Sequence, residues 1–394
     1  MTVKRRYLSQ NILKDLNSGK MVFVGGPRQV GKTTMAKNIG EINYGNFAYL
    51  NWDSREDRQT IIADNLPSES KLIVFDELHK FRQWKNYVKG LYDKNDSGKQ
   101  ILVTGSARLD LYRRGGDSLM GRYHYYRLHP FSLREMLEVD PEITIGQDLN
   151  FLKNQQALTA AKNTLFKFGG FPEPLFAQDE TVWRRFQNER LDRVIKEDIR
   201  ELETLRDLSK LQILAELLPN KVSSLLSLNN LRKDLETTFK TISLWMQILE
   251  NFYFHFRLYP YANSKIKSLR KQPKMYLWDW SSIQNENVRL ENMVASHLLK
   301  FTHYLYDTQG WKVELFFWRD ADEREVDFLV TLNGEPWLAI EVKNSDQTLS
   351  KSLSYFKKKT GVQLAYQLIN KSDVDVLRDG IRIMSMEKFL SGLV

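Results

Sequence analysis

Short apolar runs alternate with helical patterns over residues 21–135 of the chain. Each run is rich in β-branched or aromatic residues, and polar or glycine-rich residues follow it. The runs are Met21–Gly25, Phe47–Trp52, Lys71–Phe75, Ile101–Thr104 and Tyr123–Leu128. Strands that alternate with helices are typical of an open parallel sheet with helices on both faces. We therefore predict an α/β domain in this part of the chain.

The later segments have a different period. Over residues 150–221 the apolar positions recur with helical spacing, with a break at Gly169–Pro172. Residues 225–262 indicate two short helices followed by an aromatic-rich hairpin. Strand-like runs return after the basic segment 264–274, so residues 275–370 indicate a second α/β unit. A chain of 394 residues also exceeds what one core usually fills, which favours several domains.

Composition excludes several kinds of site. The chain has no cysteine, which rules out disulfides, thiolate zinc sites and cysteine nucleophiles. Its six histidines show no paired spacing, which disfavours a zinc enzyme. The basic N-terminal residues are not followed by the apolar stretch of a signal peptide, and no run approaches the roughly 18 apolar residues of a membrane span. We expect a cytoplasmic protein that does not associate with a membrane.

The segment GPRQVGKT at residues 26–33 fills every fixed position of the P-loop pattern GxxxxGK[ST]. It follows a strand-like run and precedes a helical pattern, as the motif requires. Glycines let backbone N–H groups converge on phosphate oxygens, and the helix N-terminus adds a favourable dipole. Lys32 supplies a charge for the β- and γ-phosphates, and the Thr33 hydroxyl can ligate Mg²⁺. We predict that ATP or ADP contacts Gly26, Pro27, Arg28, Gln29, Val30, Gly31, Lys32, Thr33 and Thr34.

A second element supports nucleotide hydrolysis. Four apolar residues, Leu72–Phe75, are followed by the carboxylates Asp76 and Glu77. A buried central strand would end there, at the sheet edge where phosphates bind. Asp76 would hold Mg²⁺ through water, and Glu77 would polarise the attacking water. The alternative is two solvated acids after a strand, which the upstream P-loop disfavours.

Three further residues are candidates for contacting the nucleotide. In P-loop NTPases a polar residue at the end of a neighbouring strand contacts the γ-phosphate or its water, which suggests Thr104 and Ser106. Small residues in a turn would give the same pattern. Arg122 is a candidate arginine finger that reaches the phosphate of a neighbouring subunit. An ordinary surface arginine would account for it equally well.

Acidic and basic residues recur in two late strand-like runs. Asp327 lies in Glu325–Val330, and Glu341 and Lys343 lie in a run that follows a turn at Gly334. The spacing suits adjacent strands of a hairpin, and Glu341 and Lys343 would point to one face because side chains alternate along a strand. Two carboxylates beside a lysine can hold Mg²⁺ or Mn²⁺ and position water for phosphodiester attack. Glu291, in a helical stretch, could add a third carboxylate. A solvent-face ion pair is the competing interpretation.

On these two sites together, the chain resembles the prokaryotic AAA+ ATPase family whose C-terminal half is the domain of unknown function 4143. The resemblance covers nearly the whole chain, in order. The motifs that carry it are GPRQVGKTT, IVFDELHK, TGSARL, LMGRY, LHPFSLREM, GGFPEPL, FFWRDADEREVDFLV and LAIEVKNS. The segment KMYLWDWSSI departs from the usual strand–Asp–Thr–Gly pattern of the family.

The resemblance implies a PD-(D/E)xK nuclease-like fold for residues 275–370. Asp327, Glu341 and Lys343 stand at that motif's positions, and Glu291 at its usual helical acid. It also implies a winged-helix module between the two ends of the chain. In that module Leu231–Leu235 would be the first helix, Thr238–Asn251 the recognition helix and Phe252–Pro260 the wing.

We therefore expect an α/β protein of four parts. Residues 1–140 would form an AAA+ P-loop ATPase domain with a parallel sheet, and residues 141–222 a helical region. Residues 223–265 would form the winged-helix-like module, and residues 266–394 an α/β domain of the restriction-endonuclease type. AAA+ modules usually act as oligomers, so a homo-oligomer is expected.

A net charge of +9 is compatible with a polyanionic partner such as DNA, but many lysine-rich proteins are basic without binding nucleic acid. Two basic groups would lie where DNA phosphates could be neutralised. They are Lys265, Lys267, Arg270, Lys271 and Lys274 beside the wing, and Lys351, Lys357, Lys358 and Lys359 after the late strands. A solvated loop and helix face explain them almost as well. We expect the prominent aromatics to lie in the core rather than to stack on bases: Tyr123, Tyr125, Tyr126, Phe252, Tyr253, Phe254 and Phe256.

The leading functional prediction is a Mg²⁺-dependent ATPase that couples ATP to the binding, remodelling or cleavage of DNA, including branched DNA. Catalysis would use Lys32 and Glu77 at one site and Asp327, Glu341 and Lys343 at the other. The alternative is an ATP-dependent switch that acts on a protein partner and carries an inactive nuclease-like domain. A third, weaker alternative is a metal-independent DNA-binding regulator.

Overall fold

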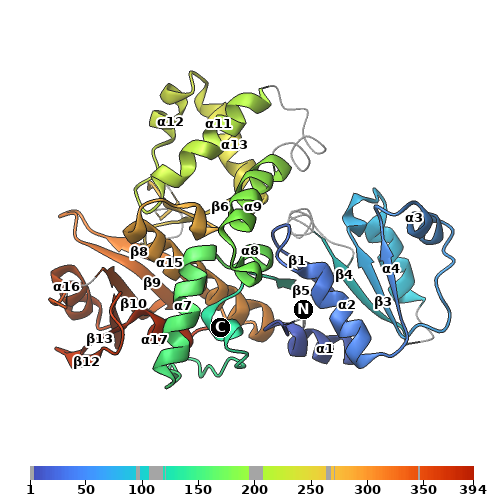
Figure 1. Ribbon diagram of the computed structural model, residues 1–394, viewed down its shortest axis with the longest axis horizontal. Helices are drawn as coiled ribbons and strands as arrows, with labels where there is room; N and C mark the ends of the chain where they lie inside the picture. The colour runs from blue at the N-terminus through green and yellow to red at the C-terminus, as the bar shows by residue number, and fades with distance from the viewer. Residues whose placement is uncertain are drawn as a thin grey trace. The chain divides into compact units, whose positions relative to one another are not determined.

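The computed structural model describes residues 4–94, 98–105, 119, 121–194, 207–262, 268–269, 271–344 and 347–394. The chain forms two compact units, Met1–His129 and Pro130–Val394. Figure 1 gives the labels of their helices and strands. The four-part division expected from the sequence is finer than these two units and stays a prediction.

The first unit is built on a five-stranded parallel sheet. Its strands lie in the order β2-β3-β4-β1-β5, and every neighbouring pair is parallel. The bounds are β1 Met21–Gly25, β2 Phe47–Asn51, β3 Leu72–Asp76, β4 Gln100–Thr104 and β5 Tyr123–Arg127. The five strand-like runs in the sequence predicted these strands to within a residue or two, and the parallel α/β fold is confirmed.

Helices flank this sheet on both sides. The helices are α1 Ser9–Asn17, α2 Lys32–Asn43, α3 Arg55–Ile62 and α4 Trp84–Asp93, with a short 3₁₀ helix η1 at Leu78–Lys80. Alternate residues of the strands, such as Phe23 and Phe75, form one core with Ile61 of α3 and Trp84 of α4. The strand residues between these, such as Val22, point to the other face of the sheet, because side chains alternate along a strand. The helices α1 and α2 contact the strands on that face. Strands buried on both faces explain why their sequences are nearly continuous apolar runs.

The second unit begins with helices. They are α6 Leu133–Met136, α7 Gln155–Phe168, α8 Pro172–Ala177, α9 Glu180–Asp192, α11 Leu208–Leu217, η3 Leu218–Lys221, α12 Leu228–Asp234 and α13 Phe239–Asn251. This run agrees with the helical period over residues 150–221. Gly169, whose φ is +78°, follows α7, and a Cβ there would lie 2.7 Å from a carboxylate oxygen of Asp279.

The predicted wing is formed differently from the sequence expectation. Residues Phe252–Pro260 contain one strand, β6 His255–Leu258, and not a complete hairpin. The antiparallel partner of β6 is β7 Lys274–Leu277, which begins at the last residue of the basic segment 264–274. The aromatic-rich run of residues 252–260 therefore contains a single strand whose partner comes later in the sequence. The winged-helix module as such stays a prediction.

A mixed six-stranded sheet follows, in the order β12-β13-β11-β10-β9-β8. Its bounds are β8 Val313–Arg319, β9 Glu325–Leu332, β10 Glu335–Lys343, β11 Leu364–Ile369, β12 Asp375–Arg378 and β13 Ile381–Ser385. The strands β8, β9 and β10 form an antiparallel meander, and β10, β11 and β13 are parallel. The helices are η4 Trp280–Ser282, α15 Glu286–Gln309, α16 Lys351–Thr360 and α17 Met386–Ser391.

The aromatic residues lie where the sequence placed them. Tyr125, Tyr126 and the four aromatics of residues 252–256 are buried, and Tyr123 is partly buried against the core of the first unit. Their role in packing is therefore confirmed. Among the described helices, none has both the length and the apolar composition of a membrane-crossing helix.

Candidate functional site

The P-loop connects the end of β1 to the start of α2. Gly26 has φ +155°, and a Cβ there would lie 2.4 Å from the carbonyl oxygen of Leu128. Gly31 caps α2 with φ +97°, in the left-handed region that favours glycine. A larger residue at either position would move the loop, so both glycines of the motif are required by the backbone. The N-terminus of α2 thus opens at the carboxyl edge of the sheet, the position that favours phosphate.

Lys32 is buried at this edge, with 6% of its surface exposed. Its ammonium group donates to the carbonyl oxygens of Gly26 at 3.0 Å and Pro27 at 2.8 Å. The loop therefore folds around the lysine and holds its charge inside the turn. This is the charge that the sequence assigned to the phosphates.

Asp76, the last residue of β3, collects three hydroxyl donors. Thr33 Oγ1 donates to Oδ2 at 2.6 Å, and Thr104 Oγ1 donates to Oδ1 at 2.5 Å. Tyr49, on β2, donates to Oδ2 at 2.7 Å. The parallel register places Asn51, Asp76 and Thr104 side by side at the strand ends. Thr33, Asp76 and Thr104 are thus brought together, while Tyr49 was missed because an aromatic within a strand-like run is read as packing.

Glu77 follows β3 with φ +55°, a conformation that non-glycine residues adopt infrequently. Its main-chain N–H donates to the Thr104 carbonyl at 3.0 Å. Burial raises the pKa of the Glu77 carboxyl, Lys32 opposes this shift, and Asp76 adds to it. Oε2 of Glu77 is buried without a hydrogen bond in the described part of the chain, and His79 Nε2 lies 3.5 Å away. A raised pKa and an unsatisfied oxygen suit a group that accepts a proton from water.

Arg6, near the N-terminus, holds the P-loop through hydrogen bonds to main-chain carbonyl groups. Arg6 is buried, and its guanidinium donates to the carbonyl oxygens of Val30 at 2.6 Å and His129 at 2.5 Å. The neighbouring Tyr7 donates to the Arg127 carbonyl at 2.7 Å. This role of Arg6 was not predicted. In the sequence, Arg6 belongs to a short basic run near the N-terminus, and nothing in that run distinguishes an arginine that holds the P-loop from a solvated one.

The remaining nucleotide candidates have different outcomes. Ser106 lies outside the described residues. Arg122 precedes β5, beside Met21 at the start of β1, so it lies at the sheet edge opposite the P-loop. Its Nε donates to Asp93 Oδ1 at 2.8 Å. Arg122 therefore does not reach the P-loop of its own unit, and its action on a neighbouring subunit stays a prediction.

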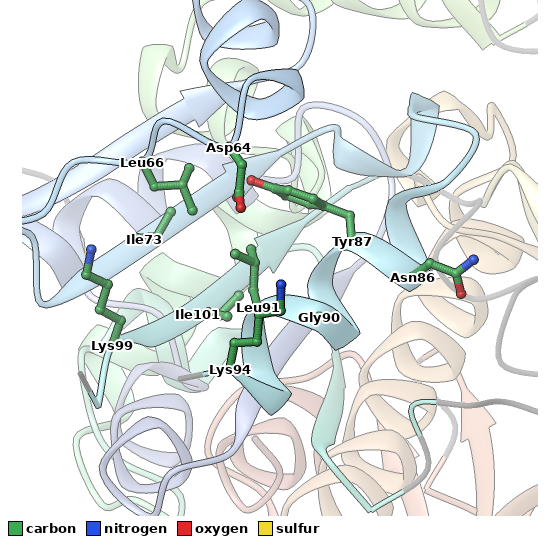
Figure 2. A pocket seen from close by; sticks show the side chains of 10 residues that line it. All are labelled: Asp64, Leu66, Ile73, Asn86, Tyr87, Gly90, Leu91, Lys94, Lys99 and Ile101. Carbon is green, nitrogen blue, oxygen red and sulfur yellow. The ribbon is translucent and has the colours of Figure 1, made fainter. Parts of the chain in front are cut away.

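A pocket of about 440 Å³ lies beside α4, away from the P-loop. Figure 2 shows its lining side chains, with the hydroxyl of Tyr87 pointing toward Asp64. Ile73 and Ile101, near the beginnings of β3 and β4, form part of its wall. Because no P-loop residue lines it, the pocket is separate from the nucleotide site.

The late carboxylates also converge. We call Glu291, Glu325, Asp327 and Glu341 the acidic cluster. Asp327 on β9 lies across from β10 and accepts from the Val342 N–H at 2.8 Å. Lys343 Nζ lies 2.8 Å from Glu341 Oε1, which confirms that these two side chains share a face. Burial, then Glu341 and Glu291, raise the pKa of the Asp327 carboxyl well above its ordinary value, while Lys274 lowers it.

Lys274 corrects the sequence interpretation of the basic segment. The residue is buried, and its ammonium forms an ion pair with Glu325 inside the acidic cluster, so it is not part of a surface that could bind DNA. Burial alone would lower the pKa of Lys274, but Glu291, Asp327 and Glu325 together raise it. Lys271 is exposed, as expected. Lys265, Lys267 and Arg270 lie outside the described residues.

The second basic group is only partly available to a partner. Lys357 donates to the carbonyl oxygens of Val362 at 2.9 Å and Gln363 at 2.8 Å, beyond the end of α16. The Lys359 ammonium lies 5.7 Å from the centre of the Trp318 ring. Lys351, Lys358 and Lys359 are exposed on α16.

The acidic cluster does not have the donor arrangement of a metal site. Oxygens of Glu291, Asp327 and Glu341 accept hydrogen bonds from protein groups, and Lys274 approaches three of the four carboxylates. Within the described ranges, no group of three or more His, Asp or Glu residues is placed to hold a metal ion. The Mn²⁺ or Mg²⁺ expected at this cluster therefore does not fit the residues as they stand.

Three family models match the chain. Residues 18–137 match a model described as an AAA domain, residues 161–285 a domain of unknown function 8612, and residues 289–389 the domain of unknown function 4143. An uncharacterised protein of Methanocaldococcus jannaschii is 26% identical over 354 residues, covering 83% of this chain and 76% of that protein. An uncharacterised protein of Mycobacterium bovis is 22% identical over 371 residues, covering 90% of this chain and 77% of that protein.

Two solved structures are similar at low identity. A Walker-type ATPase of Pyrococcus abyssi is 12% identical, covers 70% of this chain and 93% of its own, and gives a TM-score of 0.41. The RuvB Holliday junction branch migration motor of Thermotoga maritima is 16% identical, covers 64% of this chain and 87% of its own, and gives a TM-score of 0.31. The P-loop and its parallel sheet agree with the model matched by residues 18–137: this range is an AAA domain with a P-loop, and residues 289–389 match the domain of unknown function 4143.

Proposed function

We propose that this protein hydrolyses ATP at the P-loop with Mg²⁺, using Glu77 as the base. The observation that carries the proposal is the contact of 2.6 Å between the Thr33 hydroxyl and the Asp76 carboxylate. A hydroxyl and a carboxylate side by side at a helix N-terminus are the ligands that Mg²⁺ takes in P-loop NTPases. The bound ion would supply positive charge beside the β- and γ-phosphates.

The other residues of the site would have separate roles. Backbone N–H groups around Gly31 would cradle phosphate oxygens, and Lys32 would offset their charge. Thr104 would fix one oxygen of Asp76 through the contact of 2.5 Å. Glu77, with its raised pKa and buried free oxygen, would accept a proton from the attacking water.

Phosphate release tests this proposal. The full chain should release phosphate from ATP only with Mg²⁺, and Lys32→Ala should reduce turnover by at least about a hundredfold, in line with the loss of transition-state charge stabilisation. Lys14→Ala is the matched control, because Lys14 is an exposed lysine on α1. Equal turnover in Lys32→Ala and the unaltered chain would reject the assignment.

We propose DNA as the target to which ATP turnover is coupled. The support is the net charge of +9, together with the exposed lysines of α16. The test compares turnover without DNA and with linear, single-stranded and four-way DNA at several salt concentrations. Stimulation that weakens as salt rises supports a DNA target. Flat turnover with every DNA rejects it.

A second candidate is an ATP-dependent switch on a protein partner, in which the nuclease-like domain is inactive. It is favoured by the placement of Lys274 within the acidic cluster, where a nuclease would need a metal ion. DNA-independent turnover, together with the absence of DNA cleavage in Mg²⁺ or Mn²⁺, would favour this candidate over the first.

A further inference from the structure

A buried ammonium group lies within the acidic cluster. Lys274 forms an ion pair with Glu325, and its Nζ lies 3.8 Å from Glu291 Oε1 and 3.9 Å from Asp327 Oδ1. The lysine is 3% exposed, and its ammonium lies 5.6 Å from the centre of the Phe317 ring. A buried charge requires compensating charge nearby. The charge of Lys274 is therefore compensated by the carboxylates around it.

The backbone fixes where this lysine points. Lys274 is the first residue of β7 and pairs with Leu258 of β6. At the far end of β7, the Asn292 side chain of α15 exchanges two hydrogen bonds of 2.7 Å with the main chain of Leu277. Because both ends of the strand are fixed, the lysine is directed into the cluster by regular structure and not by a surface loop.

The oxygens of the cluster already have protein donors. The Tyr276 hydroxyl donates to Glu291 Oε1 at 2.7 Å, and the Val342 N–H donates to Asp327 Oδ2 at 2.8 Å. Glu341 Oε1 accepts from the Ser350 hydroxyl at 3.2 Å, whereas its Oε2 is buried without a hydrogen bond in the described ranges. One oxygen each of Glu291, Asp327 and Glu341 is therefore engaged by a protein donor, which reduces what the cluster offers to a divalent cation that takes about six ligands.

The charge of the cluster is also compensated. Besides Lys274, Arg319 Nη1 lies 3.1 Å from Glu325 Oε2, and Lys343 lies 2.8 Å from Glu341. A divalent cation would have to share the carboxylates with these three basic groups at short range. Repulsion between like charges opposes such sharing, most strongly beside the buried Lys274, because Arg319 and Lys343 are partly exposed.

We infer that in this chain the Lys274 ammonium occupies the place of a divalent cation, so that the acidic cluster binds no catalytic metal and its domain does not cut DNA. The inference rests on the geometry of the cluster and is independent of ATP hydrolysis at the P-loop. The domain of unknown function 4143 then contributes binding or packing, and the acidic cluster with its lysine is a structural ion network.

The test is a titration of the full chain with Mn²⁺, with free Mn²⁺ measured by electron paramagnetic resonance. All proteins carry Asp76→Asn, which removes the carboxylate of the P-loop site. The comparison adds Lys274→Met, which keeps most of the side-chain volume, and Lys274→Met with Asp327→Asn. Lys271→Met is the control, because Lys271 is an exposed lysine close in sequence. Thermal unfolding checks that each protein is folded.

We expect no Mn²⁺ bound by the chain with Lys274 intact at millimolar concentration, and none by Lys271→Met. Lys274→Met should gain one Mn²⁺ per chain and lose it when Asp327→Asn is added. The inference is overturned if the chain with Lys274 intact binds Mn²⁺ in a way that Asp327→Asn abolishes, or if folded Lys274→Met binds none. Should Lys274→Met not fold, DNA cleavage decides: cutting in Mn²⁺ that Asp327→Asn removes contradicts the inference, and no cutting supports it.

Discussion

Asp76 is the residue on which the contacts of the nucleotide site converge. Three hydroxyl groups, from Thr33, Tyr49 and Thr104, donate to its two oxygens. Charge-assisted hydrogen bonds of this kind are roughly twice as strong as neutral ones, so the carboxylate is held in one orientation before a ligand arrives. The pattern of four apolar residues followed by two acids predicted the position of Asp76 but not the donors around it.

Arg6→Ala should loosen the P-loop. The substitution leaves the Val30 and His129 carbonyls without their buried donor, which costs about 1–3 kcal/mol of stability in the first unit. Urea unfolding should show this loss of stability. The dissociation constant for ATP should rise by about tenfold for each 1.4 kcal/mol by which the substitution destabilises the ATP-binding conformation of the P-loop. Lys14→Ala should change neither quantity. Unaltered ATP affinity in Arg6→Ala would show that the clamp is only structural.

The pH dependence of turnover should report on Glu77. Burial raises the pKa of this carboxyl above its ordinary value of 4.5. A base must be deprotonated, so turnover should be full at neutral pH and fall as the pH decreases through the raised pKa. Glu77→Gln should have low turnover at every pH and still bind ATP. An acid limb that persists unchanged in the residual activity of Glu77→Gln would assign it to another group.

At the scale of elements, the strands of the first unit were predictable from the sequence. The pairing of β6 with β7 in the second unit was not. Buried parallel strands have continuous apolar runs, and Met21–Gly25 coincides with β1 residue for residue. The partner of β6 lies beyond residues 259–273, and no local pattern encodes a pairing at that distance. For the same reason the sequence placed Lys274 on a surface, whereas tertiary pairing directs it inward.

Asn292→Ala tests how β7 is held. The Asn292 side chain bonds both the N–H and the carbonyl of Leu277. Its loss leaves the N–H without this acceptor and the carbonyl with only the Ser296 hydroxyl at 3.4 Å. We expect the second unit to lose about 1–3 kcal/mol, chiefly from the buried N–H that is left without an acceptor. Denaturant unfolding measures the change, with Asn287→Ala as control because Asn287 is exposed on the same helix. Equal losses in the two variants would contradict this role.

At the scale of the whole molecule, two buried histidines couple stability to pH. His255 and His297 are both buried in the second unit, and burial lowers the pKa of each to about 4 from 6.5. The unfolded chain therefore binds more protons between pH 6.5 and about 4, and stability should fall as the pH decreases through this window. Each histidine should contribute up to roughly 3 kcal/mol, since one pKa unit corresponds to about 1.4 kcal/mol.

Thermal unfolding between about pH 7 and about pH 4.5 measures this effect. His255→Gln keeps a donor for the Met246 carbonyl, which lies 2.9 Å from His255 Nε2, and should flatten part of the slope. A midpoint that does not change with pH in the unaltered chain would mean that the imidazoles bind protons equally in the folded and unfolded states, and would contradict this expectation.

Two units of different chemistry share one chain. The first has the nucleotide site, and its residues were foreseen because the P-loop pattern is local in sequence. The second has an acidic cluster whose residues were foreseen individually, while its neutralising lysine was not. If ATP hydrolysis is coupled to a DNA target, ATP turnover must respond to DNA. If the target is a protein partner, turnover should not respond to DNA.

If the P-loop binds Mg²⁺–ATP, calorimetric titration of the full chain with ATP and Mg²⁺ should measure that binding. One ATP should bind per chain, with binding lost in Lys32→Ala and retained in Lys14→Ala and Glu77→Gln. The absence of heat in the unaltered chain, or equal heat in Lys32→Ala, would contradict this expectation.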